Sequence, residues 1–222
     1  MTDSEGPNET IADILIDFAE FLNETLVAHA FAVLGLVELK RVHLEKVPEH
    51  QRGWDPVILV NARSGGSSPP DHDACVSLSQ ALELMRDGGP IEARLSQQWI
   101  VSTFAAWEEW IRPRLAKVRG CDERGLTFPL FGDLRRLRND VVHHGGIATG
   151  KNAGKCKCFG NWLSAGDEIL LTADALGLFM RLMPWSEMEA GPASAATDVE
   201  GSQVPELVRS LQHHHTASDD EQ

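Results

Sequence analysis

The chain has little of several features that would narrow its class at once. It has no tyrosine and only four cysteines among 222 residues, and it contains no run of eighteen or so uncharged apolar residues. The missing run predicts no membrane-spanning helix, and the first ten residues lack the basic start and apolar run of a secretory signal. We therefore expect a cytoplasmic protein without a membrane partner. A hydrophobic share of 42% is ordinary for one folded domain with tails.

The four cysteines, Cys75, Cys121, Cys156 and Cys158, do not follow the double-pair spacing of a zinc site. Because nothing marks the chain for export, we expect reduced thiols. Cys156 and Cys158 alternate with lysine, which is typical of one face of a strand. A metal site that joins this pair to another cysteine or a histidine has no support from spacing. The sequence thus predicts no metal and no cofactor.

Basic residues are scarce overall but concentrated in one segment. The net charge of -13 argues against a protein that coats nucleic acid through a general positive field. Residues 111 to 160, however, hold eleven Lys and Arg against four acidic residues, a local balance of +7. This basic segment is consistent with a solvated face or with an anion-binding site.

The first half of the chain predicts helices separated by a loop. Thr10 and Asp13 resemble a capping box, and apolar residues keep helical spacing to about residue 47, as one helix or as two with a break near Gly35. Residues 48 to 70 predict a loop with one edge strand at "VILV".

A second predicted helix runs from 75 to 87, capped by Asp71 or Asp73. A third predicted helix begins at Pro90 and places Trp99, Trp107 and Trp110 along one face, which is most simply core packing.

The second half predicts a loop at 119 to 132 and a helix from Asp133 to Gly145, where glycine is a natural terminator. Residues 155 to 172 predict a small β-hairpin that turns at "SAGD". A last helix follows, capped by Thr172. We expect a flexible N-terminus at 1 to 9, a helical domain at 10 to 185 and a disordered acidic tail at 186 to 222.

The stretch "LRRLRNDVVHHGG", residues 134 to 146, gathers polar groups on a predicted helix. On a helical wheel Arg138 falls among Leu134, Leu137, Val141 and Val142. Asn139 and His143 share the neighbouring face with Arg135, and Asp140 lies further round towards solvent. A buried guanidinium needs a partner. In one alternative, Glu108 or Glu109 forms an ion pair with Arg138. In the other, the guanidinium lies at a cleft or subunit interface, where it would bind a phosphate.

His143 adds proton-transfer chemistry to this helix. A histidine with an ordinary pKa near 6.5 donates or accepts a proton at neutral pH. Cleavage of RNA by its own 2'-hydroxyl needs proton transfer and a cation on the developing phosphorane, and it needs no metal. An arginine and a histidine supply both requirements.

The segment "RNDVVH", Arg138 to His143, resembles the motif of the HEPN superfamily, in which four to six residues separate an arginine from a histidine. Its surroundings strengthen the resemblance: "FGDLRRLRNDVVHHGGIAT", the upstream "FAAWEEWIRPRLA" and the following "GKCKCFGNWLSAGDEILLT" are similar to one set of bacterial HEPN-like proteins. The resemblance covers roughly residues 95 to 172.

The resemblance implies an all-α, HEPN-like helical bundle that dimerises with its two motif helices facing each other. It also implies a metal-independent endoribonuclease of the toxin or phage-defence type, without cofactors. Arg138 would stabilise the scissile phosphate, His143 would act as acid or base, and Asn139 would position the pair, with Asp140 and His144 in support.

Four cations of the basic segment would bind RNA: Arg135, Arg136, Lys151 and Lys155. A protein antitoxin or regulatory partner is compatible with this class. The alternative is a non-catalytic HEPN module that binds a nucleotide, RNA or a partner protein.

Overall fold

The computed structural model describes residues 9–44, 57–60, 74–159 and 163–190, and most of these residues are helical, which confirms the all-α class. The chain divides into two compact units, Met1–Val27 with Ser96–Gln222 and Ala28–Leu95. The predicted flexible N-terminus at 1 to 9 lies outside the described residues except for Glu9, and the predicted tail at 186 to 222 lies outside them beyond residue 190.

The first helix, α1, spans Ile11–Leu39 and continues into a π-helical turn, η1, at Lys40–Leu44. The capping box at its start is confirmed, because the Asp13 amide donates to Thr10 Oγ1 at 3.2 Å and the Thr10 amide donates to Asp13 Oδ2 at 2.9 Å. The helix passes through Gly35 without a break, so the single-helix alternative holds. The predicted end at 47 lies outside the described residues.

By length and composition, the helical stretch Ile11–Val42 qualifies as long and apolar enough to cross a membrane. The core helix of a soluble protein and a signal sequence meet the same criterion. The early part of α1 packs in a core, where Ile14, Phe18 and Leu22 are completely buried, but only 11% of the apolar window is buried.

The predicted helix from Pro90 forms as three consecutive helical segments: α4 at Pro90–Ala105, a π-helical segment η2 at Ala106–Ile111, and α5 at Arg112–Arg119. Gly120 ends the run with a left-handed φ of 61°, a conformation that glycine adopts without steric cost. The π-helical segment was not predicted from the apolar spacing.

Aromatic rings form the core of the first unit. Trp107 stacks on Phe131 with ring centroids 3.9 Å apart and an interplanar angle of 4°. Phe18 packs against both rings and against Trp185. Trp99 meets Phe179 edge to face at 5.0 Å. The core role predicted for Trp99 and Trp107 is therefore confirmed.

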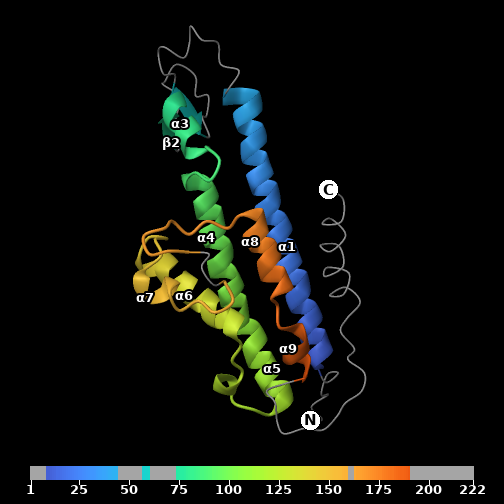
Figure 1. Ribbon diagram of the computed structural model, residues 1–222. Coiled ribbons are helices and arrows are strands. Elements are labelled where there is room, and N and C mark those ends of the chain that lie inside the picture. The colour runs from blue at the N-terminus through green and yellow to red at the C-terminus, as the bar shows by residue number, and fades with distance from the viewer. Residues whose placement is uncertain (1–8, 45–56, 61–73, 160–162, 191–222) are drawn as a thin grey trace, which may run out of the picture. The chain divides into compact units, whose positions relative to one another are not determined.

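Trp110 departs from the predicted core face. Its side chain is 39% exposed, and the Arg114 guanidinium lies 5.1 Å from its ring centroid. Arg114 also binds Glu9 and Asp17, so Trp110 belongs to a surface cluster that joins α5 to the start of α1. Because α1 and α5 approach each other through successive pairs of this kind, the two helices run antiparallel (Figure 1).

The motif helix, α6, spans Pro129–His143 and begins earlier than the predicted Asp133. Proline at the first helical position is pre-set for the helix, and Leu130 and Phe131 are buried, so core packing extends the helix towards its N-terminus. A short 3-10 turn, η3 at Glu123–Gly125, precedes it. Figure 1 shows α6 crossing α4 and α5 obliquely.

Three shorter helices complete the unit: α7 at Gly150–Ala153, α8 at Ala173–Arg181 and α9 at Trp185–Ala190. The cap predicted at Thr172 is confirmed, because its hydroxyl accepts from the Ala175 amide at 3.2 Å. The last helix, α9, begins at Trp185, the residue at which the sequence predicted the end of the helical domain.

Strand-like pairing after α6 differs from the predicted hairpin. A turn at "SAGD" exists, with the Ser164 amide on Asp167 Oδ2 at 2.8 Å. Its outgoing arm pairs with residues 146–148, through the single bridge Ile147↔Glu168, instead of with residues 155–159. The amides of residues 157–159 are bound by Asp133 and so are unavailable to a hairpin. Residues 160–162 lie outside the described part.

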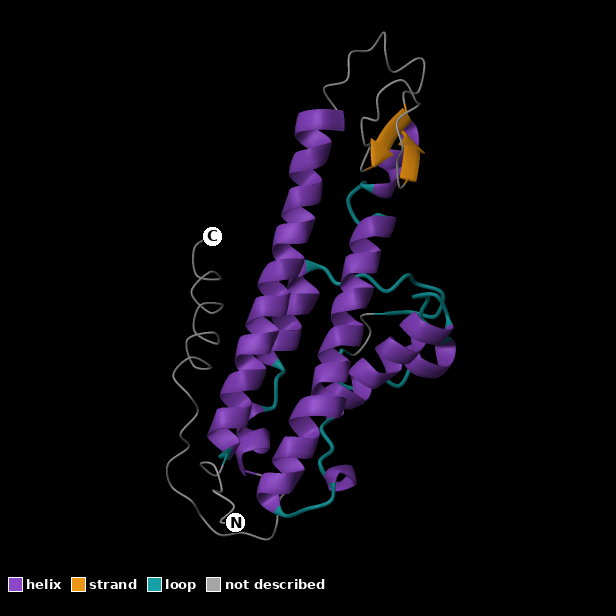
Figure 2. Cartoon of the chain, turned by 180° about the vertical axis from the view of Figure 1, so that it is seen from behind, coloured by secondary structure: helices purple, strands orange, loops and turns teal. Residues whose placement is uncertain are grey.

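The second unit contains a two-stranded antiparallel sheet, β1 at Val57–Val60 and β2 at Ala74–Ser77, with Val57 opposite Ser77 (Figure 2). The edge strand predicted at "VILV" is thus confirmed. The helix predicted from residue 75 begins later, as α3 at Leu78–Leu84, because Ser77 and Gln80 form a capping box. Asp71 and Asp73, the predicted caps, lie outside the described residues.

Replacing Trp107 should test whether its ring is the centre of this core. We expect Trp107→Ala to lower the free energy of unfolding by about 3–5 kcal/mol, because it removes a fully packed ring and leaves a cavity. Trp110→Ala, at a partly exposed tryptophan three residues away, should cost roughly 1 kcal/mol or less. Urea denaturation followed by circular dichroism measures both, and equal losses would contradict the assigned core.

Candidate functional site

The motif helix α6 has one buried and one solvent-facing side. Leu130, Leu134 and Leu137 are buried against the aromatic core. The opposite side carries Arg135, Val142 and His143, all exposed, with Arg138 and Asn139 partly buried at its border. The predicted position of Arg138 within the apolar face is therefore corrected to the edge of that face.

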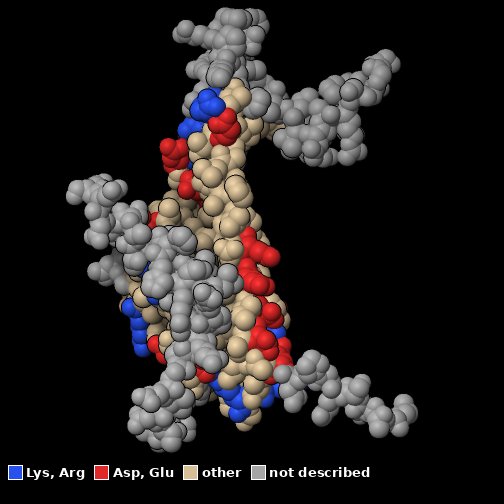
Figure 3. Space-filling model, turned by 90° about the vertical axis from the view of Figure 1, so that its right-hand side faces the viewer, with Lys and Arg blue, Asp and Glu red and all other residues tan. Residues whose placement is uncertain are grey.

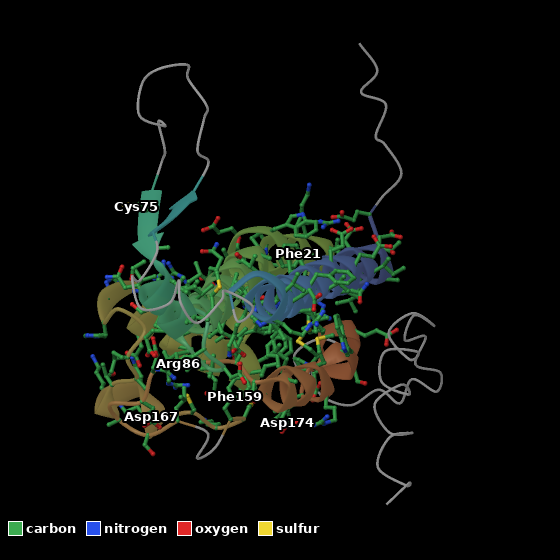
Figure 4. All side chains as sticks on the ribbon, turned by 90° about the horizontal axis from the view of Figure 1, so that it is seen from above. Phe21, Cys75, Arg86, Phe159, Asp167 and Asp174 are labelled. Carbon is green, nitrogen blue, oxygen red and sulfur yellow. The ribbon has the colours of Figure 1, made fainter. Side chains whose placement is uncertain are left out.

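Asp133 lies on the buried side of α6 and is completely inaccessible. Its Oδ2 accepts from the backbone amides of Lys157 at 2.8 Å, Cys158 at 2.7 Å and Phe159 at 3.3 Å. Its Oδ1 accepts from the Arg136 guanidinium at 2.9 Å. One carboxylate thus fixes three consecutive residues of the following loop onto the helix. The last of them is Phe159, which is labelled in Figure 4. Its ring stacks on that of Phe179 of α8.

Asp140, two helical turns further on, binds the same loop nearer to its start. Its Oδ2 accepts from the Thr149 amide at 2.9 Å, and its Oδ1 accepts from the Thr149 hydroxyl at 2.9 Å and the Asn152 amide group at 2.6 Å. The prediction that Asp140 lies towards solvent is wrong, since only 1% of it is exposed. Residues seven apart share a helix face, and the loop supplies the donors that a buried carboxylate needs.

The C-terminal end of α6 places both histidines in solvent. His143 is the last helical residue, and the exposed His144 caps the helix through its amide, which donates to the Asp140 carbonyl at 2.9 Å. Gly145 and Gly146 follow with φ of 64° and 84°, which confirms glycine as the terminator. Gly146 passes so close to Gln97 of α4 that a Cβ there would lie 2.1 Å from Gln97 Nε2.

Gln97 was not predicted as part of the site. Its side chain is almost completely buried and donates to the Ile169 carbonyl at 3.4 Å, while the Ile169 amide donates to the Gly146 carbonyl at 2.8 Å. Gln97 therefore holds the loop directly after the motif histidines. No sequence signal marked Gln97, because on a helical wheel it lies about 160° from Trp99, off the predicted tryptophan face.

Arg138 does not form the ion pair that was one of the two predicted alternatives. Its guanidinium donates to Asn139 Oδ1 at 3.3 Å, and within the described ranges it meets no carboxylate. Glu108 instead pairs with Arg112 at 2.6 Å, one turn along its own helix. The guanidinium of Arg138 consequently stands at the edge of the exposed side of α6 with donors to spare.

Several cations of the basic segment are occupied within the subunit. Those with internal partners are Arg112, Arg114, Arg119 and Arg136, which bind acidic side chains or, for Arg119, the backbone carbonyls of Met188 and Glu189. Of the four cations predicted to bind RNA, Arg135, Lys151 and Lys155 are exposed, whereas Arg136 is held by Asp133. Three of the four predicted cations are thus exposed.

Cys156 and Cys158, in the loop after α7, are poorly suited to bind a metal or to act as nucleophiles. Burial, followed by the charge of Asp133, raises the pKa of the Cys156 thiol to about 11, and burial likewise raises the pKa of Cys158. Thiols with such pKa values stay protonated at neutral pH, whereas a metal ligand or nucleophile is a thiolate. Among the residues that the structure describes, no three His, Cys, Asp or Glu side chains come together as a metal site.

Comparison of the chain with family models, with curated proteins and with solved structures found no match. The resemblance of residues 95 to 172 to HEPN proteins therefore rests on the quoted motif and its surroundings.

Removing the Asp140 carboxylate should release the start of the loop selectively. We expect Asp140→Ala to lower the free energy of unfolding by about 3 kcal/mol, because three donors lose a charged acceptor. In hydrogen exchange the Thr149 amide should lose protection, while the Lys157 amide, bound by Asp133, should keep it. Asp174→Ala, at an exposed aspartate on α8, is the matched control. Loss of protection at both amides, or at neither, would contradict two separate attachments.

Substitution of the two terminator glycines should separate backbone strain from steric overlap. Gly145→Ala places a Cβ in open space and should cost roughly 1–2 kcal/mol, the penalty of a left-handed residue. Gly146→Ala adds an overlap with the amide end of the buried Gln97 side chain, which would have to move, and it should cost more than Gly145→Ala. Thermal and urea unfolding measure these losses. Gln97→Ala should recover part of the Gly146→Ala loss when the two are combined, and strict additivity would refute the contact.

Proposed function

We propose that this protein is a HEPN-like, metal-independent RNA endonuclease of the toxin or phage-defence type, which acts in the cytoplasm as a homodimer through Arg138 and His143. The observation that carries the proposal is that, within the described residues, no ion pair holds the side chains of Arg138 and His143. His143 is exposed at the end of α6, and the Arg138 guanidinium has a neighbouring amide oxygen as its partner, with no described carboxylate neutralising it.

Dimerisation through α6 would bring the two groups onto one phosphate. Five residues separate Arg138 from His143, which is about 140° around a helix, so the two side chains of one subunit diverge. A two-fold axis beside α6 presents each motif to its copy, because an isologous interface uses the same surface twice. Val142 supports such an interface, since it is 50% exposed and lies on the wheel between Arg138 and Asn139.

In this arrangement the RNA supplies its own nucleophile. His143 of one subunit accepts the proton of the 2'-hydroxyl as its oxygen attacks the adjacent phosphorus, and the bond from phosphorus to the 5'-oxygen breaks. A second imidazole, from the other motif or from His144, donates a proton to the leaving 5'-oxygen. Arg138 stabilises the extra negative charge on the phosphorane, and Asn139 orients its guanidinium. Asp140 supports this chemistry indirectly, by fastening the loop.

The surface around the motif fits RNA without a general positive field. Arg135, Lys151 and Lys155 are exposed on α6, α7 and the turn after α7. Three cations beside a histidine pair suit contacts to a few phosphates of a loop or strand end, where RNA is read by shape and stacking. A regulatory or antitoxin protein would act by covering this face.

One observation favours the second candidate, a non-catalytic HEPN module that binds a nucleotide, RNA or a protein. Four arginines of the basic segment are engaged inside the subunit, and the whole chain carries a net charge of -13. Strong internal use of cations leaves little non-specific attraction for RNA. This module would fold and dimerise in the same way without turnover.

RNA cleavage in the presence of EDTA distinguishes the two candidates. We expect the purified protein to cut structured or single-stranded RNA in EDTA, and Arg138→Ala and His143→Ala each to lower the rate by about 100-fold or more, as loss of an acid–base group does. Cleavage products should carry a 2',3'-cyclic phosphate, which mass spectrometry detects.

The matched control is Arg124→Ala, which removes an exposed arginine from η3 and should leave the rate unchanged. Equal cleavage by wild type and both motif variants would identify a contaminating nuclease. A folded wild type that cuts none of the RNAs would reject the enzyme and leave the binding module.

A further inference from the structure

Gln97 is a polar side chain buried against the turn that follows the motif histidines. It lies on α4 with a relative exposure of 2%, and its Nε2 donates to the Ile169 carbonyl at 3.4 Å. An amide group loses its hydration on burial, so an apolar side chain of similar size would be easier to bury. What distinguishes a glutamine at this position is therefore the set of contacts that its amide group makes.

The amide end of Gln97 lies directly against the backbone of Gly146. A Cβ built on Gly146 would overlap Nε2, Cδ and Oε1 of Gln97, so the whole amide group occupies the space that a side chain at residue 146 would need. The φ of 84° at Gly146 lies in the left-handed region, which glycine adopts without steric cost. The turn can approach α4 this closely because residue 146 has no side chain.

The backbone of Gly146 is also bound at both of its polar groups. Its amide donates to the Asp140 carbonyl at 3.2 Å, and its carbonyl accepts from the Ile169 amide at 2.8 Å. The same Asp140 carbonyl accepts from the His144 amide at 2.9 Å. A displacement of Gly146 would therefore displace His144 and the end of α6, where His143 lies.

We propose that Gln97 is a positioning residue for RNA cleavage: its amide group fixes the turn at Gly146, and thereby the backbone from which His143 and His144 present their imidazoles. This inference rests on the proposed ribonuclease and adds to it a residue from a different helix. Gln97 does not touch the RNA, because it is buried, and it acts only through the turn that it contacts.

A positioning residue of this kind affects the chemical step. Proton transfer needs each imidazole within hydrogen-bond reach of the reacting oxygen, and a displacement of about 1 Å can lower the rate by about 100-fold. Loss of the Gln97 amide should therefore reduce kcat.

Binding of RNA, in contrast, depends on the charges at the surface. Glu20 and Glu24 are exposed on α1, and Figure 3 shows acidic side chains in red on this side of the molecule, whereas Arg135 is an exposed cation on α6. A substitution at Gln97 alters none of these charges, so KM should stay the same.

Steady-state cleavage of RNA in EDTA tests the positioning role. We expect Gln97→Ala to lower kcat by about 10-fold or more and to leave KM within about threefold, since only a group that acts in the chemical step is disturbed. Gln98→Ala is the matched control. Gln98 is the next residue of α4, it is exposed and donates to Ser102 Oγ at 3.3 Å, and its loss should leave both constants within about twofold.

A second variant covers the case in which the alanine variant does not fold. Gln97→Met keeps most of the volume against Gly146 and removes the amide group, and it should lower kcat by about threefold or more with KM unchanged. Circular dichroism and the melting temperature verify that each variant folds, and the kinetics are measured well below the lowest melting temperature.

Hydrogen exchange measures the hold on the turn without any RNA. In Gln97→Ala the Ile169 amide, which donates to the turn, should lose protection by about 10-fold or more, whereas the Lys157 amide, bound by Asp133, should keep it. Gln98→Ala should leave both amides unchanged.

The two measurements separate this inference from the proposed function. If the wild type cuts RNA but the Gln97 variants cut it with the same kcat, or lose activity through KM alone, the positioning role is rejected and the ribonuclease stands. An Ile169 amide that keeps its protection in folded Gln97→Ala also overturns the role. If the wild type cuts no RNA, the ribonuclease and this role are both rejected, and a change in exchange would leave Gln97 as a structural contact only.

Discussion

Two buried carboxylates on one helix decide how the second half of the first unit is arranged. Asp133 and Asp140 lie on the inner side of α6 and accept six donors from residues 149–159 between them, four of which are backbone amides. A buried charge is costly unless it is well bonded, and a loop without strand partners leaves amides that need acceptors. The loop supplies donors to the two carboxylates, and the carboxylates supply acceptors to the loop amides. The loop therefore lies on the helix instead of forming a sheet.

This attachment also determines what the motif can do. Because the inner side of α6 is occupied by leucines and the two aspartates, Arg138, Asn139 and His143 are left on the outer side. The loop fastened by Asp140 leaves the helix at Gly145 and Gly146, directly after the histidines, and Gln97 supports it from α4. The imidazoles therefore sit on a fixed backbone while their side chains stay accessible. Such pre-organisation is consistent with the proposed ribonuclease site, in which the motif would hold a phosphate.

Elements with a strong local signal could be predicted from the sequence. The caps at Thr10 and Thr172, the glycine stop after α6 and the edge strand at 57–60 each depend on neighbouring residues alone. Features decided by distant residues were not predictable in this way. Asp140 was assigned to solvent because it lies about 160° from Arg138 on the wheel, and only the donors of Thr149 and Asn152 make its burial favourable.

The prediction of a hairpin at 155 to 172 was not met for the same reason, because the amides of its first arm are bound by Asp133, more than twenty residues earlier.

The position of Arg138 shows a second limit of prediction from local sequence. Local spacing put Arg138 within the apolar face, whereas its observed position is at the edge of that face, and the spacing could not choose between a partner at Glu108 and an open surface. Glu108 is not the partner of Arg138 because it forms an ion pair with Arg112.

The π-helical segment between α4 and α5 has a consequence for chain length. Its hydrogen bonds skip one residue more than those of an α-helix, so the segment holds the equivalent of one inserted residue in an otherwise continuous rod. This phase offset explains why Trp107 and Ile111 turn inward while Trp110 turns outward. A chain lacking one residue here would wind as a regular α-helix through the same total rotation, so Arg114 would still face Asp17.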